Sequence, residues 1–168
     1  MSHPVADEPP GAHIDALNLV RDAVAAAPDP TSAAQRAADV LHDRFPHYDW
    51  VGIYWVDDAG TELVLGPWNG PEPTEHTRIP MGAGICGAAA ASGTTEIVDD
   101  VNLDPRYLAC FATTRSEIVV PIFADGQVVG EIDIDGSDLA AYDQTDAHFL
   151  EEVAALLAAL RPRAAMPS

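Results

Sequence analysis

Lysine is absent from this sequence, and its eight basic residues are all arginines. Against them stand 27 acidic residues, so the formal net charge is −19. A surface of that sign repels the phosphates of nucleic acids and the headgroups of anionic lipids. We therefore expect neither a nucleic acid nor a membrane surface among the partners of this chain.

Long apolar runs are absent as well. No stretch approaches the roughly 20 residues that cross a bilayer. The first residues, MSHPVADEPPGA, lack the apolar core of a secretory signal. We therefore expect a cytoplasmic protein, in which thiols stay reduced. Hydrophobic residues still make up 48% of the 168 residues, which predicts one globular domain with a packed core.

Cysteine is scarce: the only two are Cys86, in GICG, and Cys110, in LACF. In a reducing compartment a structural disulfide is the least favoured interpretation, which leaves buried small hydrophobes or redox groups. Neither a CxxC motif nor a histidine at ligand spacing accompanies either thiol, so no metal site is predicted. Cys86 lies where a glycine-rich segment leads into an alanine-rich one, at or near a helix N-terminus, where a thiolate is favoured and its pKa lowered.

The hydrophobic pattern predicts an α+β fold. Helical spacing of apolar residues predicts helices over 13–27, 31–45 with Thr31 as N-cap, 84–93 and 142–160. Alternating or β-branched segments predict strands over 48–56, 62–66, 95–100, 116–123 and 127–135, the last two joined by an Asp-Gly turn. This order favours an antiparallel sheet with helices packed on one side. We expect tails at 1–12 and 161–168 around one domain, 13–160, with a long loop over 67–80.

Acidic residues gather in the stretch GEIDIDGSD. On a strand, Glu131, Asp133 and Asp135 project to one face, and the hairpin register can bring Glu117 beside Asp133 or Asp135. Such acids usually face water. Aliphatic neighbours on nearly every side favour partial burial instead, and carboxyl groups sharing such a site raise one another's pKa. A cluster of this kind can receive an ammonium group or donate a proton.

Two aromatic residues lie in the first predicted strand. Trp50 and Tyr54 are four residues apart, so their side chains project from the same face and can form the wall of a small apolar pocket. Core packing is the commoner role of such a pair.

Taken together, these blocks resemble a GAF domain, and specifically the free methionine-(R)-sulfoxide reductases built on that fold. The resemblance rests on WVGIY, LVLGP, RIPMGAGICGAAAASG, ACFATTRSEIVVPIF and GEIDID, which occur in the family's order. The separation of the two thiols also agrees with the family. The resemblance implies a GAF-like antiparallel sheet with helices on one face and a ligand pocket on the other.

The resemblance also implies roles for the two thiols. Cys110 and Cys86 match two thiols of the family's redox set, and we favour Cys110 as the thiol that attacks the sulfoxide and becomes a sulfenic acid. In that assignment Cys86 is the resolving thiol, and it forms a disulfide that a thioredoxin-like protein reduces. The match does not fix which of the two attacks first. No cofactor or metal is implied. The oligomeric state is not fixed by the sequence, and a homodimer stays open.

The same comparison assigns substrate contacts. Glu117, Asp133 and Asp135 match acids that hold the ammonium group of free methionine sulfoxide and polarise its S=O bond. Trp50 and Tyr54 match the aromatic wall around the sulfoxide methyl group.

Three positions depart from the family pattern. His76 stands where a third cysteine is usual, which leaves Cys86 or an external thiol to reduce the sulfenic acid. Phe111 follows Cys110 where aspartate is frequent. Glu131 replaces an aliphatic residue, and we expect it to face solvent. Two further hypotheses stay open, namely a non-catalytic GAF module that binds a small ligand and a redox sensor that uses the two thiols as a switch.

Overall fold

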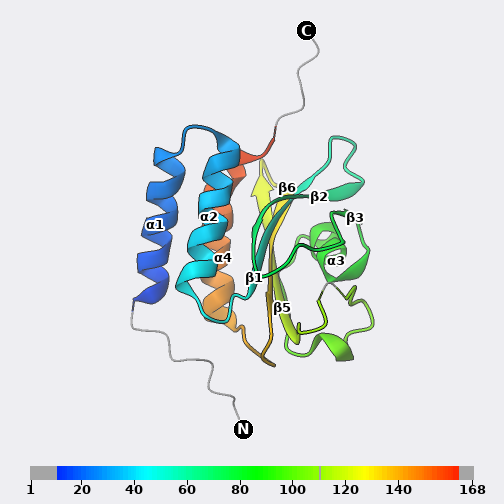
Figure 1. Ribbon diagram of the computed structural model, residues 1–168. Helices are drawn as coiled ribbons and strands as arrows, with labels where there is room; N and C mark the ends of the chain where they lie inside the picture. Colours follow the sequence, from blue (N-terminus) through cyan, green and yellow to red (C-terminus); the bar gives the residue numbers. More distant parts are fainter. Residues whose placement is uncertain (1–10, 110, 163–168) are drawn as a thin grey trace.

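The computed structural model describes residues 11–109 and 111–162. In Figure 1 a central sheet separates a layer of three helices from a smaller layer on its other side. The helices are α1 (Ala12–Ala26), α2 (Pro30–Arg44), α3 (Gly84–Ser92) and α4 (Gln144–Leu157), with short 3₁₀ turns at Val101–Leu103 and Ala158–Leu160. The strands are β1 (Trp50–Val56), β2 (Glu62–Asn69), β3 (Arg78–Pro80), β4 (Glu96–Val98), β5 (Ser116–Ala124) and β6 (Gln127–Gly136).

The six strands form one sheet in the order β3-β2-β1-β6-β5-β4, and every neighbouring pair is antiparallel. β5 and β6 form a hairpin whose turn residues, Asp125 and Gly126, both have positive φ angles of 53° and 76°. A turn with two positive φ angles matches the right-handed twist of the strands it joins, and Asp-Gly is a favoured sequence for it. The predicted hairpin is therefore confirmed, and it fixes the register of the acidic strand.

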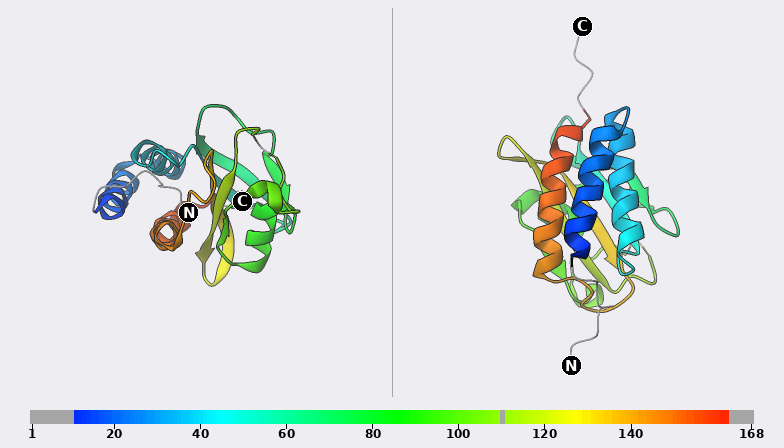
Figure 2. Two further views of the ribbon diagram at one scale, coloured as in Figure 1. Left: turned by 90° about the horizontal axis from the view of Figure 1, so that it is seen from below. Right: turned by 90° about the vertical axis from the view of Figure 1, so that its left-hand side faces the viewer.

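Three helices cover one face of the sheet. α2 and α4 contact the strands, and α1 packs on α2 and α4 as the outermost element (Figure 2). The strand residues that alternate toward this layer are apolar and fully buried, among them Ile53, Ile118, Val120, Ile132 and Ile134. This is the principal hydrophobic core, and it confirms the predicted α+β fold with an antiparallel sheet.

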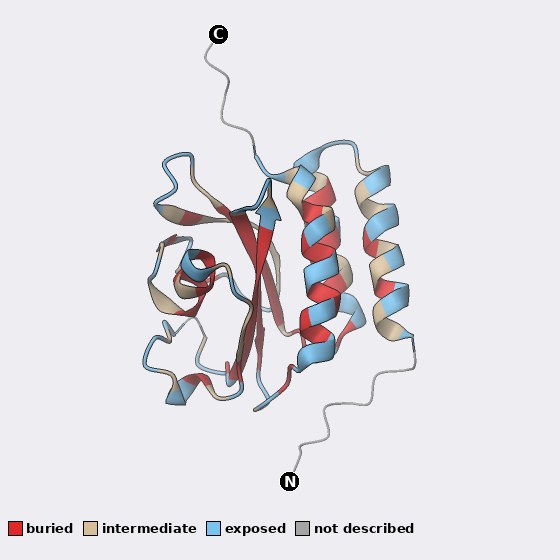
Figure 3. Cartoon of the chain, turned by 180° about the vertical axis from the view of Figure 1, so that it is seen from behind, coloured by how far each residue is buried: buried red, intermediate tan, exposed pale blue. Residues whose placement is uncertain are grey.

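The other face of the sheet is covered as well. α3 contacts β3, β5 and β6 there, and a second core forms around Trp50, Tyr54, Val119 and Cys86. Figure 3 shows the result, with the central strands buried along most of their length. The predicted helix 84–93 is therefore confirmed as α3, but it lies on the face of the sheet for which the sequence predicted only a pocket. The consequence is that residues on both faces of β6 lie inside the protein.

Several element boundaries differ from the prediction. Asp29, not Thr31, caps α2, because its side chain accepts a hydrogen bond of 2.8 Å from the Ser32 N–H and Pro30 suits the first helical position. The expected loop 67–80 is shorter, since β2 continues to Asn69 and β3 pairs with it.

The ordered elements run from Ala12 to Leu160. Of the two expected tails, residues 1–10 and 163–168 lie outside the described part of the chain. Within the described residues, no helix combines the length and the apolar character that crossing a membrane requires.

A buried polar cluster ties the end of α2 to the start of α4. The Tyr48 hydroxyl donates a hydrogen bond of 2.6 Å to the Asp146 carboxylate, and the Tyr142 hydroxyl donates one of 2.8 Å to the His47 carbonyl oxygen. Burial opposes ionisation of Asp146, but hydrogen bonds from His47 and Tyr48 outweigh it and hold the Asp146 pKa below its ordinary value.

This pair of tyrosines gives a matched test of the cluster. We expect Tyr48→Phe to lower the free energy of unfolding by about 1.5–3 kcal/mol, because the lost bond goes to a charged group, and Tyr142→Phe to lower it by about 0.5–1.5 kcal/mol. A carboxyl group whose pKa is lower in the folded protein than in the unfolded chain stabilises the fold at pH values above its unfolded pKa. That stabilisation is lost as the pH falls through the pKa of the group in the folded protein. The Tyr48→Phe deficit should therefore shrink in acid. Urea unfolding at pH 7 and at about pH 2.5, below the ordinary aspartate pKa of about 3.9, measures both deficits, and equal, pH-independent deficits would contradict this assignment.

Candidate functional site

The acidic strand β6 points its carboxyl groups into the interior. Glu131, Asp133 and Asp135 alternate along it, and their exposed fractions are 0%, 1% and 2%. The residues between them, Ile132 and Ile134, face the principal core on the opposite side. Period-2 alternation thus places three acids in one row on the α3 side of the sheet, as the sequence predicted.

Glu131 does not face solvent, and that expectation was wrong. Its side chain is fully buried because α3 covers this face of β6. The prediction assumed that the face of β6 at Glu131 is open to solvent, whereas the sheet is covered on both sides at this position.

Strand β5 adds a fourth acid. Glu117 is 4% exposed and lies directly opposite Asp135, while Val119 lies opposite Asp133. Directly opposite residues of an antiparallel pair have Cβ atoms about 4.5–5.5 Å apart, so the two carboxyl groups share one site. The predicted approach of Glu117 to the β6 acids is confirmed.

Strand β1 contributes aromatic side chains from the other neighbouring position. Trp50 lies opposite Asp135 and Tyr54 lies opposite Glu131, both on the α3 side of the sheet. Between them is Gly52, where a Cβ atom would collide with the ring of Trp50. Glycine at this position therefore lets the Trp50 indole lie against the strand, beside the acids.

Loop contacts hold these aromatic rings. The Trp50 indole N–H donates to the Glu72 carbonyl oxygen at 3.2 Å, and the Tyr54 hydroxyl donates to the His76 carbonyl oxygen at 2.8 Å. The Trp50 ring stacks on Trp68 at 6.1 Å between centroids. The segment between β2 and β3, which the sequence singled out by its length, therefore closes one side of the site.

Cys86 faces the acids from the first turn of α3. It is 7% exposed, and its Sγ atom lies 3.8 Å from Oε2 of Glu117 as a thiol donor. The helix reaches this position because Gly87 allows close approach, since a Cβ there would lie 2.5 Å from the Pro80 carbonyl oxygen. Three elements, α3, β5 and β6, thus bring one thiol and four carboxyl groups together.

Burial governs the protonation of this group. Desolvation, followed by the charge of Asp133, raises the pKa values of Glu117, Glu131 and Asp135 well above their ordinary range, and desolvation also raises that of Asp133 itself. Neighbouring carboxyl groups cannot all ionise in such a site. The cluster therefore holds protons to a higher pH than isolated carboxyl groups do, and a carboxyl group that is still protonated can donate a proton.

The thiol of Cys86 behaves in the same way. Desolvation and the charges of Asp133, Glu131 and Glu117 raise its pKa well above the ordinary value. The lowered pKa predicted from the helix N-terminus was therefore wrong, because burial among acids outweighs the helix dipole. In this state Cys86 is a neutral thiol.

Several oxygens of the cluster lack partners. In the part of the chain that the structure describes, both carboxyl oxygens of Glu131, both of Asp135 and Oδ1 of Asp133 are buried without a hydrogen bond. Buried polar atoms are nearly always paired, and each unpaired one costs about 1–3 kcal/mol. The arrangement is therefore unfavourable for folding and suited to a ligand that brings hydrogen-bond donors or positive charge.

Two small cavities adjoin the acids. One, of about 30 Å³, is lined by Trp50, Phe111 and Asp135 among others. The second, of about 10 Å³, is lined by Cys86, Glu117 and His76 among others. Each holds about one water molecule, so a larger ligand requires the surrounding loops to separate.

Cys110 lies outside the described residues. Its two neighbours in sequence contact the site, because the Ala109 carbonyl oxygen lies 3.1 Å from His76 Nε2 and the Phe111 ring lies 5.7 Å from that of Trp50. Trp68 and the wall formed by Phe111 were not expected as site residues. The only signal for Trp68 was its place near the end of a predicted strand, beside the long loop.

Comparison with known proteins agrees with this geometry. Residues 27–160 match the GAF domain family. Free methionine-R-sulfoxide reductase of Saccharomyces cerevisiae is 45% identical over 65% of this chain and 61% of its own. The Escherichia coli protein of the same name is 34% identical over 70% of this chain and 69% of its own.

Solved structures agree as well. A crystal structure of free methionine-R-sulfoxide reductase from Neisseria meningitidis, in complex with its substrate, superposes with a TM-score of 0.82 at 40% identity, covering 95% of this chain and 91% of that one. The GAF-like fold expected from the sequence is thereby confirmed. The chain belongs to the GAF-domain family of free methionine-R-sulfoxide reductases.

Proposed function

We propose that this protein reduces free methionine (R)-sulfoxide to methionine. The observation that carries the proposal is the set of buried, unpaired carboxyl oxygens beside a thiol and an aromatic wall. Relatives with this name at 34–45% identity support the same chemistry. The substrate offers an ammonium group, a sulfoxide oxygen and a methyl group, and each has a complement in the site.

The ammonium group is the natural partner of the acids. It carries three N–H donors and one positive charge, whereas the carboxylates of Glu117, Asp133 and Asp135 are acceptors. Binding would pair oxygens that are now unpaired and would lower the pKa of the acids that touch the ammonium group. A peptide-bound methionine lacks this ammonium group, which accounts for a preference for the free amino acid.

The acid that stays neutral has a second role. A carboxylic acid with a raised pKa can donate a hydrogen bond or a proton to the sulfoxide oxygen as the S–O bond breaks. Trp50 and Tyr54, on the same face, would enclose the apolar methyl group and orient the sulfur.

The two thiols divide the redox chemistry. We propose that the Cys110 thiolate attacks the sulfoxide sulfur and takes up its oxygen, which leaves methionine and a Cys110 sulfenic acid. The Cys86 thiol then displaces that oxygen as water and forms a disulfide, and a thioredoxin-like dithiol reduces it. The raised pKa of Cys86 supports this order, because the first attack needs a thiolate.

The remaining expectations complete this proposal. One GAF domain, 13–160, carries the site, and the catalytic cycle requires a reducing compartment, which we propose is the cytoplasm. A homodimer stays a prediction that sedimentation of the purified chain can test.

A coupled assay tests the reaction and the division of roles. We expect NADPH consumption with thioredoxin, thioredoxin reductase and the R form of free methionine sulfoxide, and none with the S form. Cys110→Ser should lower kcat/KM at least about 1,000-fold, or about 4 kcal/mol. Cys86→Ser should keep the first turnover but fail to cycle with thioredoxin until a small thiol is added. Binding of the sulfoxide without turnover in the wild type would instead favour a ligand-binding module.

A stability measurement tests the acids separately. A carboxyl group whose pKa is higher in the folded protein than in the unfolded chain does not reduce stability at pH values below its unfolded pKa. Stability is lost as the pH rises through the pKa of that group in the folded protein. Asn cannot ionise, so we expect Asp135→Asn to remove part of the stability loss that the wild type shows at high pH. The melting temperature at pH 8 should rise by about 2–4 °C, equivalent to about 1 kcal/mol. The same variant should lose most of its kcat/KM.

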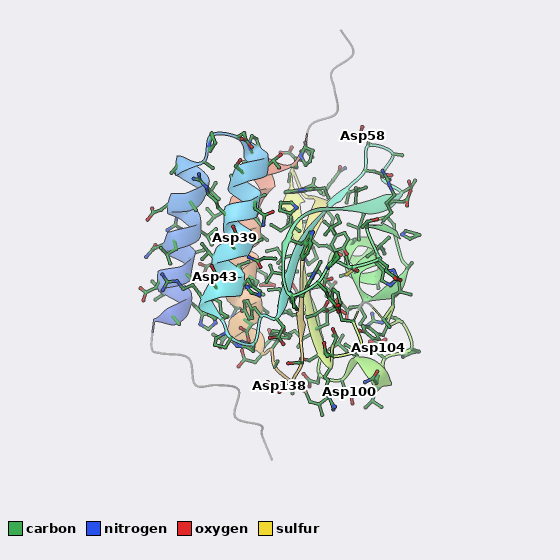
Figure 4. All side chains as sticks on the ribbon, in the orientation of Figure 1. Asp39, Asp43, Asp58, Asp100, Asp104 and Asp138 are labelled. Atoms are coloured by element: carbon green, nitrogen blue, oxygen red, sulfur yellow. The ribbon has the colours of Figure 1, made fainter. Side chains whose placement is uncertain are left out.

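Asp138→Asn is the matched control, because Asp138 is an exposed aspartate just after β6 (Figure 4). It should change neither quantity appreciably. An Asp135→Asn protein that is both less stable and fully active would contradict the proposed role of the acid.

A further inference from the structure

Among the described residues, one group of side chains has the arrangement of a metal site: Cys86, Glu117 and Asp133, whose ligand atoms all lie within 4.8 Å of one another. We propose that this group, which we call the Cys-Glu-Asp triplet, binds a thiophilic divalent cation such as Zn²⁺ or Cd²⁺. The cation would occupy the same position as the ammonium group of the sulfoxide, so it would inhibit the reductase by competition.

The spacing of the triplet suits such an ion. Zinc binds sulfur at about 2.3 Å and carboxylate oxygen at about 2.0–2.2 Å, so tetrahedral ligands lie about 3.4–3.6 Å apart. The Cys86 Sγ to Glu117 Oε2 distance is 3.8 Å before any ion binds. The three ligands come from α3, β5 and β6, and their atoms lie within 4.8 Å of one another, so shifts of about 1 Å or less would bring them to tetrahedral spacing.

A second observation points to a positively charged ligand. Oδ1 of Asp133 and both oxygens of Glu131 are buried without a hydrogen-bond partner in the described chain. Glu131 adjoins the triplet, because its charge contributes to the raised pKa of the Cys86 thiol. Acidic residues that merely cluster on a surface are solvated, whereas these are at most 4% exposed. A dication would offset a desolvated negative site.

The sequence analysis placed Cys86, Glu117 and Asp133 at the substrate site but predicted no metal there. The three ligands are far apart along the chain and belong to no local spacing motif, and a search for paired cysteines or histidines passes over a site with one thiol and two carboxylates. Only the antiparallel register and the position of α3 bring them together.

Binding must displace protons. The metal–sulfur bond forms as the Cys86 S–H proton leaves to solvent, and a proton held by Glu117 leaves as its oxygen coordinates the ion. No electron is transferred. We therefore expect the apparent affinity to rise with pH, which distinguishes coordination by the triplet from loose binding to surface carboxylates that are already ionised.

The test uses the reduced full-length chain and Cd²⁺ as probe, followed by the thiolate-to-Cd²⁺ charge-transfer absorbance in the ultraviolet. We expect one equivalent to bind to the wild type and to Cys110→Ser, and the band to vanish in Cys86→Ser. Even outer-shell changes weaken metal sites about 10–100-fold, so Glu117→Gln and Asp133→Asn should each weaken binding at least that much. Circular dichroism checks that each variant is folded.

Three results would overturn the proposal: a band that persists in Cys86→Ser, a band that is lost in Cys110→Ser, or unchanged affinity in both carboxamide variants. Metal binding rests on geometry alone, whereas competition rests on the proposed function. If free methionine (R)-sulfoxide fails to displace Cd²⁺ while the Cys86-dependent band stands, the metal site holds and the assignment of the substrate site fails. If the wild type shows no Cys86-dependent band but reduces free methionine (R)-sulfoxide normally, the metal site fails and the proposed function stands.

Discussion

The burial of four carboxyl groups on one face of a β-hairpin is the constraint on which the rest of this structure depends. Glu117, Glu131, Asp133 and Asp135 are buried on the face of the sheet that carries α3, and none of them forms an ion pair with an arginine of the described residues. Such a group cannot be fully ionised in a dry site, so it keeps protons and raises the pKa of the neighbouring thiol. The burial of these four carboxyl groups without a neutralising charge thus explains both why the cluster can bind a cation and why it can donate a proton.

The same hairpin carries the main apolar core on its other face. Ile118, Ile132 and Ile134 pack against α2 and α4, and burial of each such side chain contributes about 1.5–3 kcal/mol. The helical layer therefore offsets the cost of the acidic layer across a single sheet. From this division we expect substitutions on the α3 side to be able to raise stability while they lower activity, and substitutions on the helical side to affect mainly folding.

Much of this arrangement was predictable from the sequence, and the failures have physical reasons. Period-2 alternation and the Asp-Gly turn were sufficient to place Glu117 beside the β6 acids, because a hairpin fixes register locally. The burial of Glu131, the high pKa of Cys86 and the Cys-Glu-Asp triplet all depend on where α3 packs. Contacts of that kind join residues far apart in the chain, and the spacing of residues within a short segment does not predict them.

Infrared spectroscopy of the free protein near neutral pH shows directly whether the buried acids are protonated. We expect a C=O stretch of a protonated carboxyl group that is reduced in Asp135→Asn and in Glu117→Gln, unchanged in Asp138→Asn, and diminished when an ammonium-bearing ligand binds. A spectrum without any protonated carboxyl band, or one that these buried substitutions leave unaltered, would contradict protonation of the buried acids.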